Sequence, residues 1–216
     1  LSPITAGFVL VPGLTAMIIA GLGVVPIAKR VNARIVVPVA LLFSVGGYLG
    51  VAFGISNLGI LIVSFVALGI GIGAAETVSN ELILASAPPA KAGAASAVSE
   101  TAYELGAVLG TAVLGGILTA LYRTYLVLPA GLDPAVASAA RETLAGAHVA
   151  TTGLDAATAS AVTEAAAHAF DTGVTVTSLI GAGLVVLAAV IAAATLRTHP
   201  RLESNVARRE TGGHSG

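Results

Sequence analysis

Residues 58–78 read LGILIVSFVALGIGIGAAETV, an apolar stretch in which Glu76 is the only residue that carries a charge. An α-helix rises about 1.5 Å per residue, so a run of about 20 apolar residues is long enough to cross the hydrocarbon core of a bilayer. Comparable runs stand at 4–28, 35–55, 92–122 and 172–196. The sequence therefore predicts an all-α, polytopic membrane protein with five transmembrane helices, four of them within 1–122.

The composition of the whole chain favours a lipid environment. Hydrophobic residues make up 56% and charged residues 10% of the 216 residues, with a mean hydropathy of +0.96, whereas soluble domains carry about 25% charged residues. The absence of cysteine excludes a disulfide scaffold, a thiolate metal site and a cysteine nucleophile. No nucleophile–base pair or metal cluster can be assembled at membrane depth, so we expect no enzyme, no metal and no cofactor.

The ten Lys and Arg residues are scattered through short loops and the tail. This scatter argues against a nucleic-acid surface and allows the positive-inside rule to be applied. When the basic turn with Lys29, Arg30 and Arg34 is placed in the cytoplasm, eight basic residues fall inside and only Arg123 and Arg141 fall outside. We therefore expect a protein of the inner (cytoplasmic) membrane, with the N-terminus of this chain outside and its C-terminus in the cytoplasm.

The segment 123–171 is rich in Ala and Thr and too polar to span a membrane. Asp133 followed by Pro134 is a helix N-cap with a first-turn proline, and Asp155 begins a second, similar segment. We expect an extracytoplasmic helical hairpin here. The tail 197–216 holds almost no apolar residues and is expected to be disordered.

Two acidic residues lie inside the predicted span 92–122. Glu100 and Glu104 are four residues apart, so both carboxylates lie on one face of the helix. Counted from Lys91 at the cytoplasmic edge, they lie about 14 Å and about 20 Å deep. An acidic group at that depth costs several kcal/mol unless it faces a wet cavity, is paired or is protonated, which makes both residues functional candidates.

The membrane interior disfavours the charged form of a carboxyl group, as does a like-charged neighbour, and this suits a group that must gain and lose a proton near neutral pH. The alternative is a hydrogen-bonded structural role, or pairing with Arg residues outside this chain. Tyr103, between the two glutamates, is a secondary candidate. Glu76 is another, although it lies near the predicted cytoplasmic end of its span, where its side chain can simply reach water.

Glycines recur every four residues on two of the predicted spans. Small residues on one stripe allow helices to approach closely in lipid, so we expect these positions to serve helix packing. They are Gly46, Gly50 and Gly54 in the second span and Gly106 and Gly110 in the fourth.

The fourth span and the turn before it carry a family resemblance. Residues 87–115 read APPAKAGAASAVSETAYELGAVLGTAVLG. This stretch resembles the penultimate helix of the 14-spanner drug/proton antiporters of the major facilitator superfamily, which export quaternary-ammonium and other lipophilic cations. In that family a long outer loop, one final span and a basic tail follow this helix, and the same order is found here.

The resemblance covers essentially the whole chain, as the last five of fourteen spans. It implies that the N-terminal half of the transporter is missing and that this piece alone does not transport, because the cavity lies between two halves. It also implies that Glu100 and Glu104 couple protons to substrate binding. A further acidic residue that is common in the family is replaced here by Ser99.

The turn KRVNAR at 29–34 resembles the cytoplasmic gating loop between paired helices of the superfamily. Its candidate gating residues are Lys29, Arg30 and Arg34. The match is incomplete, because Lys29 stands where an acidic residue is usual and Asn32 where glycine is usual.

The sequence thus leads to one hypothesis and two alternatives. The hypothesis is part of a proton-coupled efflux transporter that exports lipophilic cationic drugs, with the bilayer, protons, the cation and the missing half as partners. One alternative is a dedicated exporter of a single metabolite or antibiotic on the same fold. The other is a structural membrane protein or a nonfunctional truncated fragment, which the glycine stripes would serve equally well.

Overall fold

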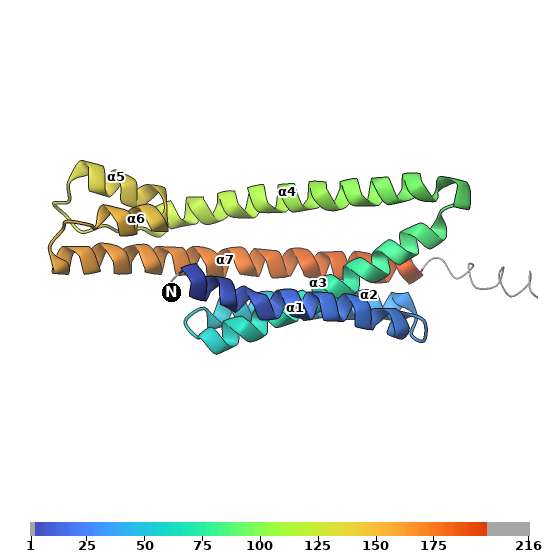
Figure 1. Cartoon of the computed structure of the whole chain (residues 1–216). Coiled ribbons are helices and arrows are strands. Elements are labelled where there is room, and N and C mark those ends of the chain that lie inside the picture. The colour runs from blue at the N-terminus through green and yellow to red at the C-terminus, as the bar shows by residue number, and fades with distance from the viewer. Residues whose placement is uncertain (1–2, 198–216) are drawn as a thin grey trace, which may run out of the picture.

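The computed structural model describes residues 3–197, and the tail predicted to be disordered lies, apart from Arg197, outside the described residues. Five helices of this part are long and apolar enough to cross a membrane. They are α1 (Pro3–Ala28), α2 (Ala33–Gly54), α3 (Leu58–Ser86), α4 (Ala92–Tyr125) and α7 (Ala156–Arg197). The short helices η1 (Pro89–Lys91), α5 (Pro134–Glu142) and α6 (Leu144–Ala150) join them (Figure 1). The protein is therefore an all-α, multi-pass membrane protein.

Helix α3 packs against α1 on one side and α2 on the other. Gly69 faces the backbone of Gly13 in α1, whereas Gly71 faces Ala40 and Ser44 in α2. Residues two apart on a helix point about 200° away from each other, so alternate glycines serve opposite neighbours. The missing side chains allow the three backbones to come close, which is how helices gain packing energy in lipid.

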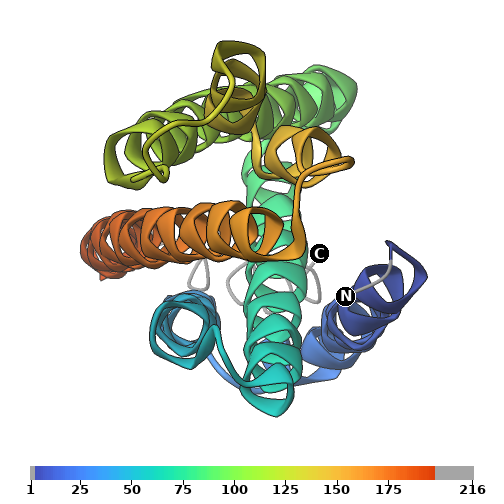
Figure 2. The same ribbon diagram turned by 90° about the vertical axis from the view of Figure 1, so that its left-hand side faces the viewer.

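Helix α7 covers the outer side of α2 and links the bundle to α4. Gly181 of α7 packs against the ring of Tyr48, and the Thr175 hydroxyl donates a hydrogen bond to the Ala52 carbonyl oxygen at 3.2 Å. Two residues before Thr175, Gly173 contacts Leu118 of α4. In the end-on view α7 lies between α4 and α2, whereas α1 lies on the other side of α3 (Figure 2).

Two helices are longer than the spans predicted from the sequence. Helix α3 continues from the predicted end at Val78 to Ser86, because no proline or glycine interrupts it before the Pro88–Pro89 pair. Helix α7 begins at Ala156, so the second arm of the predicted hairpin and the last span form one continuous helix. Residues 156–171, which precede the predicted span, are rich in alanine and contain no glycine or proline, and this favours an uninterrupted helix.

The segment between α4 and α7 forms a small cap, whose core it shares with the end of α4 and the N-terminal part of α7. The first arm of the hairpin is split at Thr143, whose extended backbone ends α5 and whose hydroxyl accepts the Gly146 N–H at 2.9 Å to start α6. The Tyr122 hydroxyl at the end of α4 donates a 2.6 Å hydrogen bond to the Ala140 carbonyl oxygen. Five side chains of this core are completely buried: Ala140, Ala147, Val162, Ala166 and Ala169.

Candidate functional site

Glu100 and Glu104 lie one helical turn apart on α4, and both are exposed. The apolar side chains around them are exposed as well, with Leu105 at 57% and Leu109 at 61%. Apolar side chains in this state are normally covered by lipid or by other protein. The N-terminal half of α4 therefore presents two carboxyl groups on a surface that residues 3–197 leave open.

Two contacts set the register between α4 and α3. The Ser99 hydroxyl donates to Oδ1 of Asn80 at 3.5 Å, and the Tyr103 hydroxyl donates to the backbone carbonyl of Glu76 at 3.5 Å. Both distances are at the long limit for a hydrogen bond. One turn forward along α4, from residue 99 to residue 103, corresponds to one turn back along α3, from residue 80 to residue 76. The two helices are thus antiparallel neighbours, with Glu76 beside the Glu100–Glu104 face.

Glu76 lies deeper in its helix than its sequence position led us to expect. Because α3 continues to Ser86, Glu76 is ten residues from the helix end, or about 15 Å along the axis. Since α3 and α4 meet at the turn around η1, this depth is comparable to that of Glu100. Glu76 thus lies inside α3 and not at its end, about as far from the connecting turn as Glu100. Its position near the cytoplasmic end of the span stays a prediction. The signal in the sequence was the lack of any helix breaker before Pro88.

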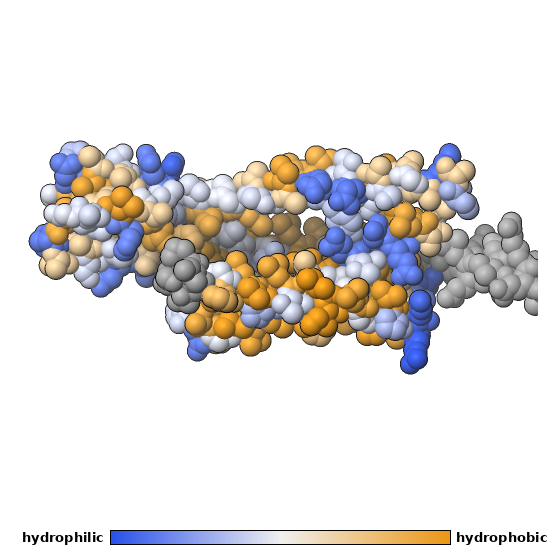
Figure 3. Space-filling view, in the orientation of Figure 1, coloured by the Kyte–Doolittle hydropathy of each residue, from blue (hydrophilic) through white to orange (hydrophobic). Residues whose placement is uncertain are grey.

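The space-filling view shows where hydrophilic side chains gather. They lie over part of α4 and over the C-terminal part of α3, next to a hollow between α4 and the lower helices (Figure 3). Within residues 3–197 no ion pair is formed by the three glutamates (Glu76, Glu100 and Glu104). Three acids without a basic partner can bind a proton or an organic cation, and Tyr103 adds an aromatic ring between them.

The predicted gating turn connects α1 to α2. Lys29 and Arg30 are exposed and Arg34 is half-buried. Asn32 caps α2, because its side-chain oxygen accepts the Arg34 backbone N–H at 3.0 Å. The turn lies at the same end of the molecule as the turn between α3 and α4 (Figure 1).

The glycines predicted to serve packing fall into two groups. Gly50 and Gly54 contact Ser64 and Ile60 of α3. The other three have no atom of the described residues within 4 Å of a Cβ position: Gly46, Gly106 and Gly110.

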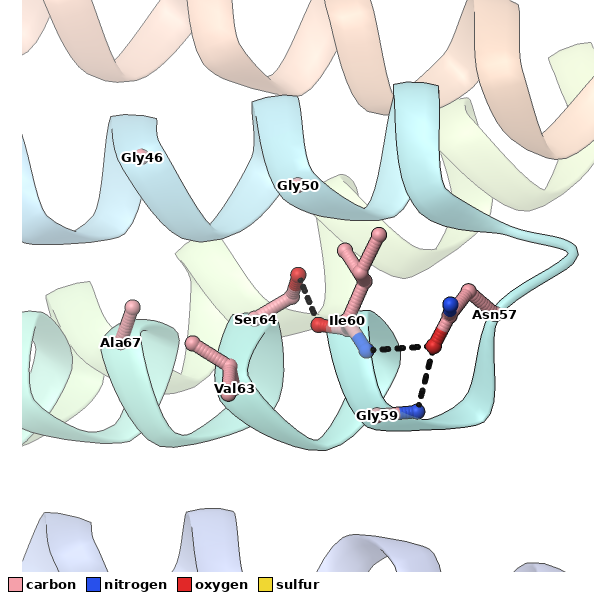
Figure 4. Close-up of a pocket in the computed structure, with 8 residues that line it drawn as sticks. All are labelled: Gly46, Gly50, Asn57, Gly59, Ile60, Val63, Ser64 and Ala67. Carbon is pink, nitrogen blue, oxygen red and sulfur yellow. Dashed lines mark hydrogen bonds between the residues drawn. The ribbon is translucent and has the colours of Figure 1, made fainter.

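Gly46 and Gly50 line a cavity of about 380 Å³ between α2 and α3 (Figure 4). Its polar groups are engaged in the helix itself. Asn57 accepts the backbone N–H groups of Gly59 and Ile60, and the Ser64 hydroxyl donates to the Ile60 carbonyl. With no charged lining residue, this cavity offers no chemistry comparable to that of the glutamates.

Comparisons with known proteins found one matching family and several similar proteins. The family model of the Major Facilitator Superfamily matches residues 1–132. The multidrug efflux pump LfrA of Mycolicibacterium smegmatis is 48% identical over 199 residues, which is 91% of this chain and 40% of that protein. The methyl viologen resistance protein SmvA of Salmonella typhimurium is 30% identical over 181 residues, 79% of this chain and 35% of that protein. The chain thus spans less than half the length of these curated relatives.

Proposed function

This chain belongs to the Major Facilitator Superfamily, and we propose that it forms the C-terminal part of a proton-coupled multidrug efflux transporter. One observation carries the proposal: Glu100 and Glu104 lie one turn apart on an open face of a membrane-spanning helix, with Glu76 of the neighbouring helix beside them. The two relatives are named for multidrug efflux and for methyl viologen resistance, which supports the proposal.

In the proposed site, a proton and a lipophilic cation compete for the same carboxyl groups. When Glu100 or Glu104 is ionised, it attracts a lipophilic cation into a region where a charge is otherwise costly. When it is protonated, that attraction is lost and the cation is released. Because the coupling between two ligands is reciprocal, a bound cation also weakens proton binding by the same factor. Tyr103 supplies a ring face on which a cation can rest.

The remaining parts of the transporter lie outside this chain. In the proposed whole protein of fourteen spans, the N-terminal half closes the other side of the cavity, and rocking of one half against the other exposes the site alternately to the two sides. The open face of α4 is where we place that cavity. The inner membrane, the outside N-terminus of this chain and the cytoplasmic turn with Lys29, Arg30 and Arg34 belong to the same proposal, which the distribution of basic residues supports.

The test uses the longer protein that contains this chain. We expect Glu100→Gln and Glu104→Gln each to reduce proton-driven efflux of ethidium and methyl viologen by about tenfold or more, because loss of a charged interaction is worth about 1.5–3 kcal/mol. Glu81→Gln is the matched control, since Glu81 is an exposed acid on α3 nearer the connecting turn. Undiminished efflux in both variants would reject the assignment.

The same assay separates the dedicated exporter from the multidrug pump. Several unrelated lipophilic cations should inhibit ethidium efflux by the multidrug pump, because a site built from carboxylates and one aromatic ring recognises charge and not shape. An exporter of a single metabolite would show no such competition while still depending on Glu100.

A further inference from the structure

The two basic residues that the topology prediction leaves on the outer side come together in one pocket. Arg123 stands in the last turn of α4 and Arg141 in the last turn of α5. They lie 18 positions apart in the sequence, yet both line a cavity of about 430 Å³. The remaining lining residues are Pro134, Ala137, Ser138 and Glu142.

The pocket carries an excess of positive charge. Two guanidinium groups and one carboxylate, that of Glu142, leave a formal charge of +1. Within residues 3–197 neither arginine forms an ion pair. A guanidinium group presents several N–H donors in a planar fork that matches phosphate oxygens, and Ser138 adds a hydroxyl donor. The donor set is therefore suited to a phosphate-bearing anion.

The position of the pocket points to the membrane surface. Arg123 lies two residues before the end of the apolar helix that closes at Tyr125. Just beyond it, Tyr125 is 47% exposed and Val127 is 80% exposed. Tyrosine at the end of a span is typical of the headgroup level of a bilayer, and an exposed apolar side chain beside it is readily covered by lipid. The arginines thus lie where lipid phosphates are found.

We propose that this pocket binds a phosphate group and that a phospholipid headgroup supplies it, with the acyl chains lying along the exposed apolar surface of α4. The site is separate from the glutamate site on the same helix and does not depend on the transport proposal. A lipid bound there joins the end of α4 to α5 and so holds the cap against the membrane.

The test measures lipid retention by the purified longer protein that contains this chain, using native mass spectrometry with added phosphatidylglycerol. Because each basic residue near the surface contributes about 1 kcal/mol toward an anionic headgroup, we expect about fivefold weaker retention for Arg123→Gln or Arg141→Gln and about 25-fold for the double variant. Arg30→Gln, in a turn at the other end of the molecule, is the control and should leave this retention unchanged. Glu142→Gln should strengthen retention, because it removes the negative charge of the pocket.

Two further ligands distinguish the possible sources of the anion. Diacylglycerol, which has the acyl chains but no phosphate, should show no dependence on the arginines. Inorganic phosphate at the same concentration should displace little lipid. Unchanged phosphatidylglycerol retention in the double variant would overturn the proposal, and displacement of the lipid by inorganic phosphate at equal concentration would overturn the lipid assignment. If the double variant fails to fold, a lack of any increase for Glu142→Gln overturns the proposal instead.

Discussion

Glycine has two different uses in this molecule. One is found in the bundle of α1, α2, α3 and α7, and the other in the single helix α4. In α3, Gly69 and Gly73 are four residues apart and both lie against the backbone of α1. In α4, Gly106 and Gly110 have the same spacing, but no neighbouring helix among the described residues comes within 4 Å of their Cβ positions. Glycine spacing alone therefore does not tell which helices touch. The helix with the open glycines is also the one that carries the two central glutamates, as expected of an element that meets a partner or substrate outside these residues.

Among the variants that test this comparison, Gly71→Ala is expected to have the largest effect on stability. A Cβ atom there would lie 2.6 Å from the Ala40 carbonyl oxygen and the Ser44 backbone nitrogen, so α2 and α3 must move apart. Such overpacking costs about 1–3 kcal/mol or more. Thermal unfolding of the purified longer protein should shift to a clearly lower midpoint.

Gly110→Ala on α4 is the matched variant. It meets no described atom, and alanine favours helix by up to about 1 kcal/mol over glycine, so the midpoint should stay the same or rise. An equal fall for both variants would break the comparison, because it would mean that α4 is packed as tightly as α3 by residues outside this chain.

The next effect concerns the C-terminal end of α4, where it packs against α5 and α6. Tyr122 is buried, and Tyr122→Phe removes the 2.6 Å hydrogen bond to the Ala140 carbonyl oxygen. A buried acceptor left without its donor costs about 1 kcal/mol or somewhat more. We expect faster proteolysis or amide exchange in α5 and α6, whereas Tyr125→Phe, at an exposed position, should change neither. Unaltered exchange in Tyr122→Phe would mean that the cap is held by its alanine core alone.

The smallest effect is a local pH dependence at the start of α7. Hydrogen bonds donated by the Thr158 hydroxyl and backbone N–H hold the pKa of Asp155 below its ordinary value of 3.8. A lowered carboxyl pKa means that the N-cap stabilises the helix above the ordinary pKa and loses this contribution as the pH falls through the folded value. Amide exchange in the first turn of α7 should therefore accelerate only in acid.

Asp155→Asn separates this titration from other acid effects. Asparagine is an equally good N-cap but carries no titrating proton, so exchange in the first turn should lose its acid dependence. The same acid dependence in the variant would assign it to another group.

Much of the fold follows from the sequence because lipid imposes strict conditions on each segment separately. The bilayer requires about 20 apolar residues per span and leaves no backbone group unpaired, so five apolar runs predict five helices. The breaks are equally local, since Pro88 and Pro89 end a helix wherever they occur. The end of α3 differs from the predicted end of its span, because hydropathy falls at Val78 before the helix itself ends at Ser86.

Only part of the candidate site could be predicted from the sequence. The four-residue spacing of Glu100 and Glu104 is enough to predict that they share one face of the helix. The contact of Tyr103 with the Glu76 backbone depends on how α3 and α4 cross, 27 positions apart in the chain. No local pattern records such a crossing, because it depends on how the two helices pack in the folded bundle on either side of the turn around η1.

The sequence by itself determined that the chain crosses a membrane, how many helices do so, and which helix carries acids in its interior. Only the tertiary structure decided which glycines are contacts, that the Glu76 backbone lies against Tyr103, and that Arg123 and Arg141 line one pocket. The physical reason is that the solvent acts on each helix separately, through length and polarity, whereas contacts between helices depend on shapes that pairs of segments acquire only together.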